Sequence, residues 1–450
     1  MTGALWLAAL CLLPLCGFPL LSHPAFRAFS IPSRIVLSGA AGAVLLSAAM
    51  TGAVLAGVRW NETAIAVTAV ALATGLRLLL GKESAPPLPP EPPRAWGGIA
   101  HLLSAAAVVC AALAAWSGSA SSPDLVFFWG AKAQQFAAAR TIDVPFLQDG
   151  FHRFMHLYYP PLVTNVYAFA TMLAGRMAWT AAVMTFPLLL AALAAGLPGV
   201  LGTLLPRTAA AAWSALAIAA VAYAGMEADV GGNGEMPLLL FETLAVALLA
   251  SPLARGAAVQ LLAGVLLAGA ATAKVEGFPF AVAAAGLFVA LGAARGRRSA
   301  AGLRLALPTA ICLGGWFAFG ATRRLFFGYA GEGRFLDLHA ARLASVARMI
   351  GGSLFATGHG LPWLAPLAAL LASATTLGLR RAAWIPLGTA AALTGFFLFT
   401  YLHRAEDPAL WISWSAARIF MAVAMLLVIA GACSTDSAPP SPRRAAPSRR

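Results

Sequence analysis

Residues 236–294 read MPLLLFETLAVALLASPLARGAAVQLLAGVLLAGAATAKVEGFPFAVAAAGLFVALGAA, and this stretch decides the fold class. Three apolar runs, at 236–251, 256–273 and 277–294, follow one another with only short polar breaks. Each run is rich in Leu and Ala and has close to the ~20 residues that a helix needs to cross a bilayer. The runs lack the alternating pattern in ten-residue segments that is typical of a transmembrane β-barrel. The stretch therefore predicts consecutive membrane helices.

The rest of the chain has the same character. Of its 450 residues, 60% are hydrophobic and only 10% are charged, and the mean hydropathy is +0.82. A soluble domain carries roughly a quarter charged residues. The sequence therefore predicts an all-α polytopic membrane protein, a bundle of about 12–14 transmembrane helices with interfacial helices in its outer loops. The further apolar runs lie at 4–22, 35–58, 62–80, 98–117, 178–202, 209–224, 302–320, 361–379, 383–401 and 411–432.

The distribution of basic residues predicts the orientation of the bundle. The net charge of +14 comes from 30 Lys and Arg against 16 Asp and Glu, and most basic residues flank the apolar runs. By the positive-inside rule such residues mark cytoplasmic loops, so the charge indicates a topology and not a nucleic-acid partner. The segments 118–160, 225–235, 321–360 and 402–410 then face outward. The residues at the predicted cytoplasmic ends include Arg27, Arg34, Arg207, Arg255, Arg304, Arg380 and Arg381.

Segment 161–176 is an exception to the spanning pattern. It is short and opens with Pro-Pro. If it crossed the membrane, 225–235 would lie on the inner side. We therefore predict a partly inserted or re-entrant helix at 161–176. Irregular backbone at membrane depth is tolerated only where protein or a water-filled cavity covers it, and this favours a functional site nearby.

The chain divides into four parts. Residues 1–80 hold the N-terminal transmembrane helices, because no Lys or Arg precedes the first apolar run as it would in a signal peptide. The Pro-rich stretch 81–97 has the composition of an extended cytoplasmic linker. Residues 98–432 form the main membrane domain. The tail 433–450, rich in Pro, Ser and Arg, is predicted to be disordered and cytoplasmic.

The outer loop 118–160 concentrates polar residues that a purely spanning protein does not need. It contains PDLVFFWGAKA at 123–133 and leads into HLYYPPL at 156–162. The triplet Ser122-Pro123-Asp124 is typical of a helix start, where Ser caps, Pro fits the first turn and Asp complements the helix dipole. Asp124 is therefore either a structural first-turn acid or a reactive carboxylate that points into a cleft. On the helix that follows, Leu125, Trp129 and Phe136 share one face.

Together with this loop, three later blocks resemble the bacterial GT-C membrane glycosyltransferases, relatives of the protein O-mannosyltransferases and the lipid A aminoarabinose transferases. The three blocks are GNGEMPL at 232–238, TAKVEG at 272–277 and LWISWSAAR at 410–418. They follow one another in the family's order, over about 120–420 of the sequence. The resemblance implies a GT-C-like membrane catalytic domain over 98–432.

The chain departs from the family pattern at three places. Glu235 stands where Asp is usual, Tyr158 stands where an acid is common, and Trp414 replaces a His-rich pattern. The resemblance still implies an inverting glycosyltransferase that moves a hexosyl or pentosyl group from a polyprenyl phosphate to an acceptor at the outer face. That acceptor is a glycolipid, a polysaccharide or a protein.

The reaction implied by the resemblance needs carboxylates. Transfer of a sugar from a lipid phosphate to a hydroxyl requires a carboxylate that accepts the proton of the acceptor, and the resemblance gives this role to Asp124. Glu235 is the second candidate, which positions the acceptor or binds Mg²⁺ or Mn²⁺ together with Asp124. Its alternative is a structural acid at a helix start. Glu242 lies seven residues further on the same helix face, and an acid inside an apolar run usually faces an interior cavity.

The reaction also needs cations that hold the leaving phosphate. The candidates are Lys274, Arg418 and Lys132. The alternative for Lys274 is a residue that snorkels to the interface. The alternative for Arg418 is an ion pair with Glu242 or Glu276, because a lone Arg at that depth costs several kcal/mol.

Further residues in the four blocks are candidates for substrate binding. Glu276 belongs to this group, with the alternative that it only pairs with Lys274. The tyrosines are equally typical of an aromatic belt at the membrane interface. The substrate-binding candidates are His156, Tyr158, Tyr159, Glu276 and Trp411.

Two other functions compete with the glycosyltransferase hypothesis. A transporter or flippase of lipid-linked saccharide would have internal repeats and acids near the membrane midplane, whereas this sequence shows no repeat. A catalytically inactive GT-C-like assembly protein is the third hypothesis, which the departures at Glu235 and Tyr158 keep open. The resemblance places the protein in the bacterial inner membrane, with its site facing the periplasm or exterior.

Overall fold

The structure is a computed structural model, and it describes residues 2–81, 97–155, 158–292, 296, 298–325, 339–355, 360–403 and 408–435. The linker and the C-terminal tail fall largely outside these ranges, and the outer loop 321–360 falls partly outside them. In the described part the chain is helical, and its single β-type contact is an isolated bridge between Ser121 and Gly231. The predicted all-α class is confirmed.

The helices follow the predicted apolar runs closely, with α20 running past the predicted start of the tail at residue 433. Their bounds are α1 (Thr2–Leu10), α2 (Leu13–Leu21), α3 (Ile31–Leu55), α4 (Glu62–Leu79), α5 (Gly97–Ser117), α6 (Gly130–Ala139), α7 (Val144–Gln148), α8 (Leu162–Ala174), α9 (Trp179–Val183), α10 (Thr185–Leu201), α11 (Arg207–Glu227), α12 (Glu235–Ala250), α13 (Ala257–Ala273), α14 (Gly277–Leu287), α15 (Arg298–Thr322), α17 (Leu343–Phe355), α18 (Leu361–Leu377), α19 (Trp384–His403) and α20 (Pro408–Ser434).

Local signals set several helix boundaries. The Ser30 side chain accepts a hydrogen bond from the Ser33 backbone N–H at the start of α3. Asn61 does the same for the Ala64 N–H at the start of α4. These side chains satisfy backbone donors that have no partner within the first helical turn.

Nine helical stretches among the described residues are long and apolar enough to cross a membrane, so the chain is a multi-pass membrane protein. Helices α12, α13, α14 and α18, which we also predicted to span, have 16, 17, 11 and 17 residues. The nine stretches are Thr2–Leu21, Ile31–Leu55, Glu62–Leu79, Gly98–Ser117, Trp179–Leu201, Arg207–Glu227, Arg298–Thr322, Arg381–His403 and Pro408–Ser434.

The exceptional segment 161–176 forms the short helix α8 of 13 residues. The backbone N–H of Ser122, before α8, donates to the carbonyl of Gly231, after α11, at 3.0 Å. These two segments therefore lie at the same end of the bundle, and an even number of crossings separates them. Trp179–Leu201 and Arg207–Glu227 supply two candidate crossings, and the partly inserted or re-entrant path of α8 stays a prediction.

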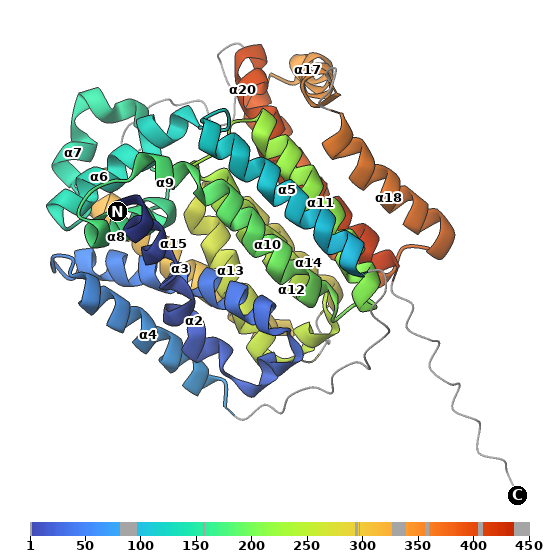
Figure 1. Ribbon diagram of the computed structural model, residues 1–450, viewed down its shortest axis with the longest axis horizontal. Helices are drawn as coiled ribbons and strands as arrows, with labels where there is room; N and C mark the ends of the chain where they lie inside the picture. Colours follow the sequence, from blue (N-terminus) through green and yellow to red (C-terminus); the bar gives the residue numbers. More distant parts are fainter. Residues whose placement is uncertain are drawn as a thin grey trace, which may run out of the picture.

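Helix α12 lies near the centre of the bundle, between α10, α13 and α20 (Figure 1). All its side chains except Pro237 are buried within the protein. By contrast, α4 and α18 lie at opposite edges of the view, and only 17% of the spanning window of α4 is buried. The two glutamates of α12 therefore face the protein interior and not lipid.

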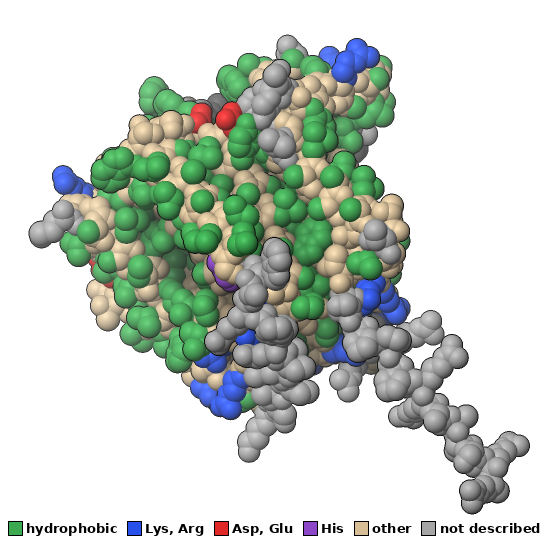
Figure 2. Space-filling model, turned by 45° about the vertical axis from the view of Figure 1, so that its right-hand side comes forward, with side chains coloured by type: hydrophobic (Ala, Val, Ile, Leu, Met, Phe, Trp, Pro, Cys, Tyr) green, Lys and Arg blue, Asp and Glu red, His purple; other side chains and the backbone are tan. Residues whose placement is uncertain are grey.

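The two ends of the bundle differ in charge. Figure 2 shows Lys and Arg side chains gathered toward the lower end, with smaller basic patches at the upper right and the far left, and Asp or Glu side chains at the upper end. In Figure 1 α20 starts at the top of the view, near α17, and runs down toward the lower right. The assignment of the two ends to the cytoplasmic and outer sides stays a prediction.

Candidate functional site

Two glycines join the polar loop to the start of α12. The Gly231 N–H donates to the Ala120 carbonyl at 2.7 Å, and the Ser122 N–H donates to the Gly231 carbonyl. A Cβ on Gly231 would lie 2.4 Å from the Ala120 oxygen, and Gly232 has a φ of +83°. Larger residues would clash or be strained here, so the sequence Gly-Gly allows the close approach that brings Asp124 near Glu235.

Asp124 is held by the predicted helix start. Its backbone N–H donates to the Ser122 hydroxyl at 3.2 Å. The next turn, Leu125–Trp129, is π-helical, and the Gly130 N–H closes it by donating to the Leu125 carbonyl. The predicted apolar face is buried at Leu125 and Trp129. Short π-helical turns inside α-helices occur frequently at functional sites.

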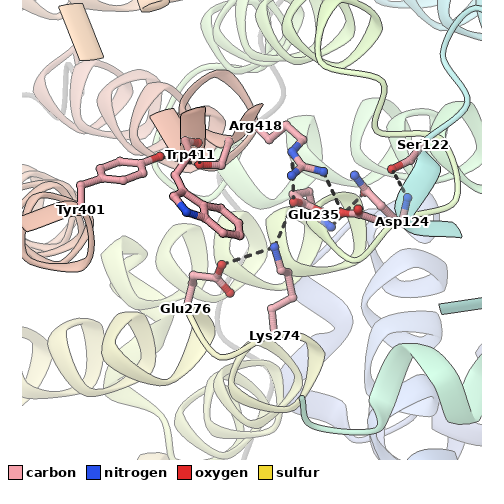
Figure 3. A network of polar contacts seen from close by, with 10 residues as sticks. Ser122, Asp124, Glu235, Lys274, Glu276, Tyr401, Trp411 and Arg418 are labelled. Atoms are coloured by element: carbon pink, nitrogen blue, oxygen red, sulfur yellow. Dashed lines mark hydrogen bonds and ion pairs between the residues drawn. The ribbon is translucent and has the colours of Figure 1, made fainter. Parts of the chain in front are cut away.

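Asp124 is the first member of a network of ion pairs (Figure 3). Its Oδ2 lies 2.8 Å from Nη1 of Arg418, and Nε of Arg418 lies 3.6 Å from Oε1 of Glu235. The same Oε1 accepts a hydrogen bond from Nζ of Lys274 at 2.9 Å. Nζ of Lys274 is also 3.3 Å from Oε1 of Glu276. The network therefore joins three carboxylates and two cations from four separate segments of the chain.

Each segment fixes its charged residue by local structure. Glu235 is the first residue of α12, and its backbone N–H donates to Oδ1 of Asn233 at 3.1 Å. Lys274 and Glu276 occupy the break between α13 and α14. This break is tight, since a Cβ on Gly277 would lie 1.9 Å from the Ala270 carbonyl oxygen.

A cavity of about 320 Å³ of empty space lies beside the network. Glu235 and Glu242 both line it, as their shared helix face predicted. The other lining residues are Leu238, Leu239, Lys274, Glu276, Phe397, Arg418, Ile419, Met421 and Ala422.

The cavity is rich in buried polar atoms that lack a partner. Oε2 of Glu235, Glu242 and Glu276 makes no hydrogen bond within the described part of the chain, and neither does Nε of Arg418. Most buried polar atoms in proteins are hydrogen-bonded. The free carboxylate oxygens need hydrogen-bond donors and the free guanidinium N–H needs an acceptor, so the cavity suits a ligand that carries both.

Burial changes the acidity of Asp124. Burial of the carboxyl and the nearby charge of Glu235 raise the pKa of Asp124 above its ordinary value, against the opposing effect of the Arg418 and Lys274 cations. A carboxylate with a raised pKa is a stronger base. The side chain keeps 24% of its exposure, so an incoming hydroxyl can reach it.

The structure brings five of the predicted site residues together: Asp124, Glu235, Lys274, Glu276 and Arg418. Glu276 pairs with Lys274, and its role in substrate binding stays a prediction. The alternative partners of Arg418 were wrong: it pairs with Asp124 and Glu235, and not with Glu242 or Glu276, because the loop before α6 folds back over α20.

The aromatic candidates surround this network. The Tyr159 ring lies 5.7 Å from the Trp129 ring and 6.0 Å from Nζ of Lys274. The Tyr158 ring packs edge-on against Tyr159. Trp411 is half-buried, and its indole lies between Tyr401 and the ion pairs (Figure 3).

Two predicted residues are not part of the network. Lys132 lies over the Trp129 ring at 5.1 Å and lines a different cavity. His156 lies outside the described residues. The sequence prediction also missed Asn233, although it stands beside Glu235 in the same block, and the Tyr401 hydroxyl, which contacts Ser415 at 2.7 Å.

The predicted Mg²⁺ or Mn²⁺ site does not fit the side chains that the structure describes. Within these residues, no three His, Cys, Asp or Glu side chains converge as metal ligands. Arg418 and Lys274 already engage Oδ2 of Asp124 and Oε1 of Glu235. The two carboxylates are thus neutralised by protein cations.

No known protein family, curated protein or solved structure matches the chain.

Proposed function

We propose that the protein is a membrane glycosyltransferase with a GT-C-like fold. It takes a sugar linked to a polyprenyl phosphate and transfers it, with inversion, to a hydroxyl of an acceptor at the outer face of a bacterial inner membrane. The acceptor is a glycolipid, a polysaccharide or a protein. We put the site on the periplasmic side, and the basic residues gathered toward the other end of the bundle support this orientation.

One observation carries this proposal. Asp124, Glu235, Lys274 and Arg418 come from the four blocks whose sequences resemble the GT-C enzymes, and they form one ion-pair network beside one cavity. Asp124 and Arg418 are separated by 294 positions in the sequence. Convergence of four distant blocks on one polar site supports a shared function for them, and the reaction requires both a carboxylate and cations.

The mechanism follows from the existing contacts. Before a donor binds, Arg418 neutralises Asp124. A donor phosphate that contacts Nε of Arg418, together with Lys274, draws the guanidinium away from Asp124. Asp124 then accepts the proton of the acceptor hydroxyl, whose oxygen attacks the anomeric carbon. The bond from that carbon to the phosphate oxygen breaks, its electron pair stays on the phosphate, and Arg418 and Lys274 hold the added charge.

The test is a turnover assay with a panel of donors. The purified protein, in nanodiscs, is incubated with polyprenyl-phosphate sugars, and sugar release or transfer is measured. Asp124→Asn should lower the rate by about 10²–10⁴-fold, because the amide can still contact Arg418 but cannot accept a proton. Asp143→Asn is the matched control, since Asn also caps a helix and Asp143 caps α7 in the same outer loop.

The outcomes separate the hypotheses. Turnover of one donor that disappears in Asp124→Asn and persists in Asp143→Asn supports the enzyme and its base. Equal turnover in both variants removes Asp124 from the role of base. No turnover of any donor by the folded protein rejects the proposal and favours a flippase or an assembly protein, which a lipid-flipping assay then distinguishes.

A further inference from the structure

A second cavity lies beside Tyr159. It has about 210 Å³ of empty space, part of it open to the surroundings, and is lined by Lys132, Phe136, Leu147, Tyr159, Pro161, Thr164 and Trp316. The Tyr159 ring also lies 6.0 Å from Nζ of Lys274, which lines the first cavity. The lining is apolar except for the Lys132 amine and the hydroxyls of Tyr159 and Thr164.

Lys132 is the unusual member of this lining. Its side chain is only 4% exposed. Within the described residues its amine has no ion pair or hydrogen bond, and its one polar contact is with the face of the Trp129 ring. A buried cation without a counter-ion is unfavourable, and a cation–π contact compensates only part of that cost.

Burial lowers the pKa of Lys132 to about 7. The amine is therefore not locked in its charged form as an ion-paired lysine is, and an anion that enters the cavity would stabilise its protonated form. The position also fits the proposed chemistry. Lys132 follows Asp124 by eight residues along one helix, which corresponds to about 12 Å at 1.5 Å per residue.

We propose that this cavity binds an anionic group of the acceptor, a phosphate or a carboxylate, through the Lys132 amine. The inference rests on the proposed function in one respect: it is the glycosyl acceptor that carries the anionic group. The Trp316 and Phe136 rings give the cavity apolar walls against which a sugar ring or lipid segment packs. Lys132 thus positions the acceptor, while Lys274 and Arg418 hold the donor phosphate in the first cavity.

The chain offers a direct measurement, because Lys82, Lys132 and Lys274 are its three lysines. The full-length protein in nanodiscs of neutral lipid is treated with trace acetic anhydride, and acetylation of each lysine is followed by mass spectrometry. The probes are inorganic phosphate, acetate as the carboxylate, and chloride at equal ionic strength. Lys82 is the internal control.

Phosphate or acetate should slow the acetylation of Lys132 about tenfold when the anion concentration is about ten times the dissociation constant of the anion. The acetylation of Lys82 should not change. Which of the two protects identifies the anion class. The same anion should raise the unfolding temperature of the wild type more than that of Lys132→Met, in which only Lys274 and Arg418 remain to bind it. Lys132→Arg, which keeps the cation, should retain part of that shift.

Equal acetylation of Lys132 in phosphate, acetate and chloride would overturn the proposal, and so would an unfolding shift of the same size in Lys132→Met and the wild type. Repeating the measurement in Asp124→Asn keeps the two proposals apart. Protection of Lys132 there, in a protein without turnover, supports the anion site whatever the fate of the glycosyltransferase assignment. Transfer activity without protection of Lys132 rejects the anion site alone.

Discussion

Substitution of Lys274 by Met tests whether the ion pairs at the site are truly buried. The amine lies 2.9 Å from Glu235 and 3.3 Å from Glu276, and the Glu235 side chain is only 4% exposed. Removing one partner of a buried pair leaves an uncompensated charge and typically costs about 3–5 kcal/mol. Lys274→Met should therefore lower the free energy of unfolding by about 3–5 kcal/mol, which corresponds to roughly 10²–10⁴-fold in the unfolding equilibrium.

Arg140→Met is the matched control. Arg140 pairs with Glu62, but these side chains are 42% and 21% exposed, and exposed pairs contribute about 0–1 kcal/mol. Unfolding of both variants in mixed micelles of increasing SDS content, followed by circular dichroism, gives the two values. Adding Glu276→Gln to Lys274→Met removes one of the stranded charges and should restore part of the loss. Losses of equal size in Lys274→Met and Arg140→Met would refute the buried network.

Three further predictions concern the acidity of Asp124, the backbone fit at Gly277 and the second glutamate of α12, Glu242. Asp124 must be ionised to act as a base, and burial raises its pKa. As the pH drops, donor turnover should therefore fall through a midpoint that lies above the ordinary Asp pKa of about 3.9. A midpoint at or below that value contradicts the assignment of Asp124 as the base. Gly277→Ala should destabilise the protein by about 1–3 kcal/mol in a thermal unfolding assay, because the added Cβ clashes with the backbone. Gly286→Ala in the same helix should be neutral, because a Cβ there would have no atom within 4 Å. Glu242→Gln should change the free energy of unfolding by less than about 1 kcal/mol, because Oε2 of Glu242 has no hydrogen-bond partner to lose. A decrease in that free energy as large as the one expected for Lys274→Met would reveal a counter-ion of Glu242.

Much of the fold could be predicted from the sequence, because the signals that define membrane helices are local. A run of apolar residues long enough to cross hydrocarbon must satisfy its own backbone and so forms a helix. The short segment that became α8 was identified by the same reasoning, combined with the requirement that 225–235 face the same side as 118–160. The hydrogen bond between Ser122 and Gly231 agrees with that requirement.

The partners within the site could not be predicted, because they depend on how helices far apart in the sequence are packed. The sequence indicated that Arg418 needs a counter-charge, but several acids had suitable depths. The choice of Asp124 depends on the Gly231 contact that folds the loop back. Similarly, Lys132 looked like a ligand of the donor phosphate. In the structure Trp129, one turn before it, faces its amine, and Lys132 lines a cavity of its own.

The unsatisfied atoms, and not the ion pairs, distinguish a functional site from a structural one here. A buried network that only stabilises a fold gains most when every donor and acceptor is paired, because each unpaired atom keeps its desolvation cost. In this cavity three carboxylate oxygens and one guanidinium N–H make no hydrogen bond within the described residues, and all of them except the Glu242 oxygen belong to side chains of the ion-pair network. Apolar residues of similar size would serve the fold at least as well. Proteins break such local rules mainly at functional sites, so the pattern is what a site prepared for a polar ligand requires, and a sugar phosphate supplies both the hydroxyl donors and the anionic oxygens that these atoms lack.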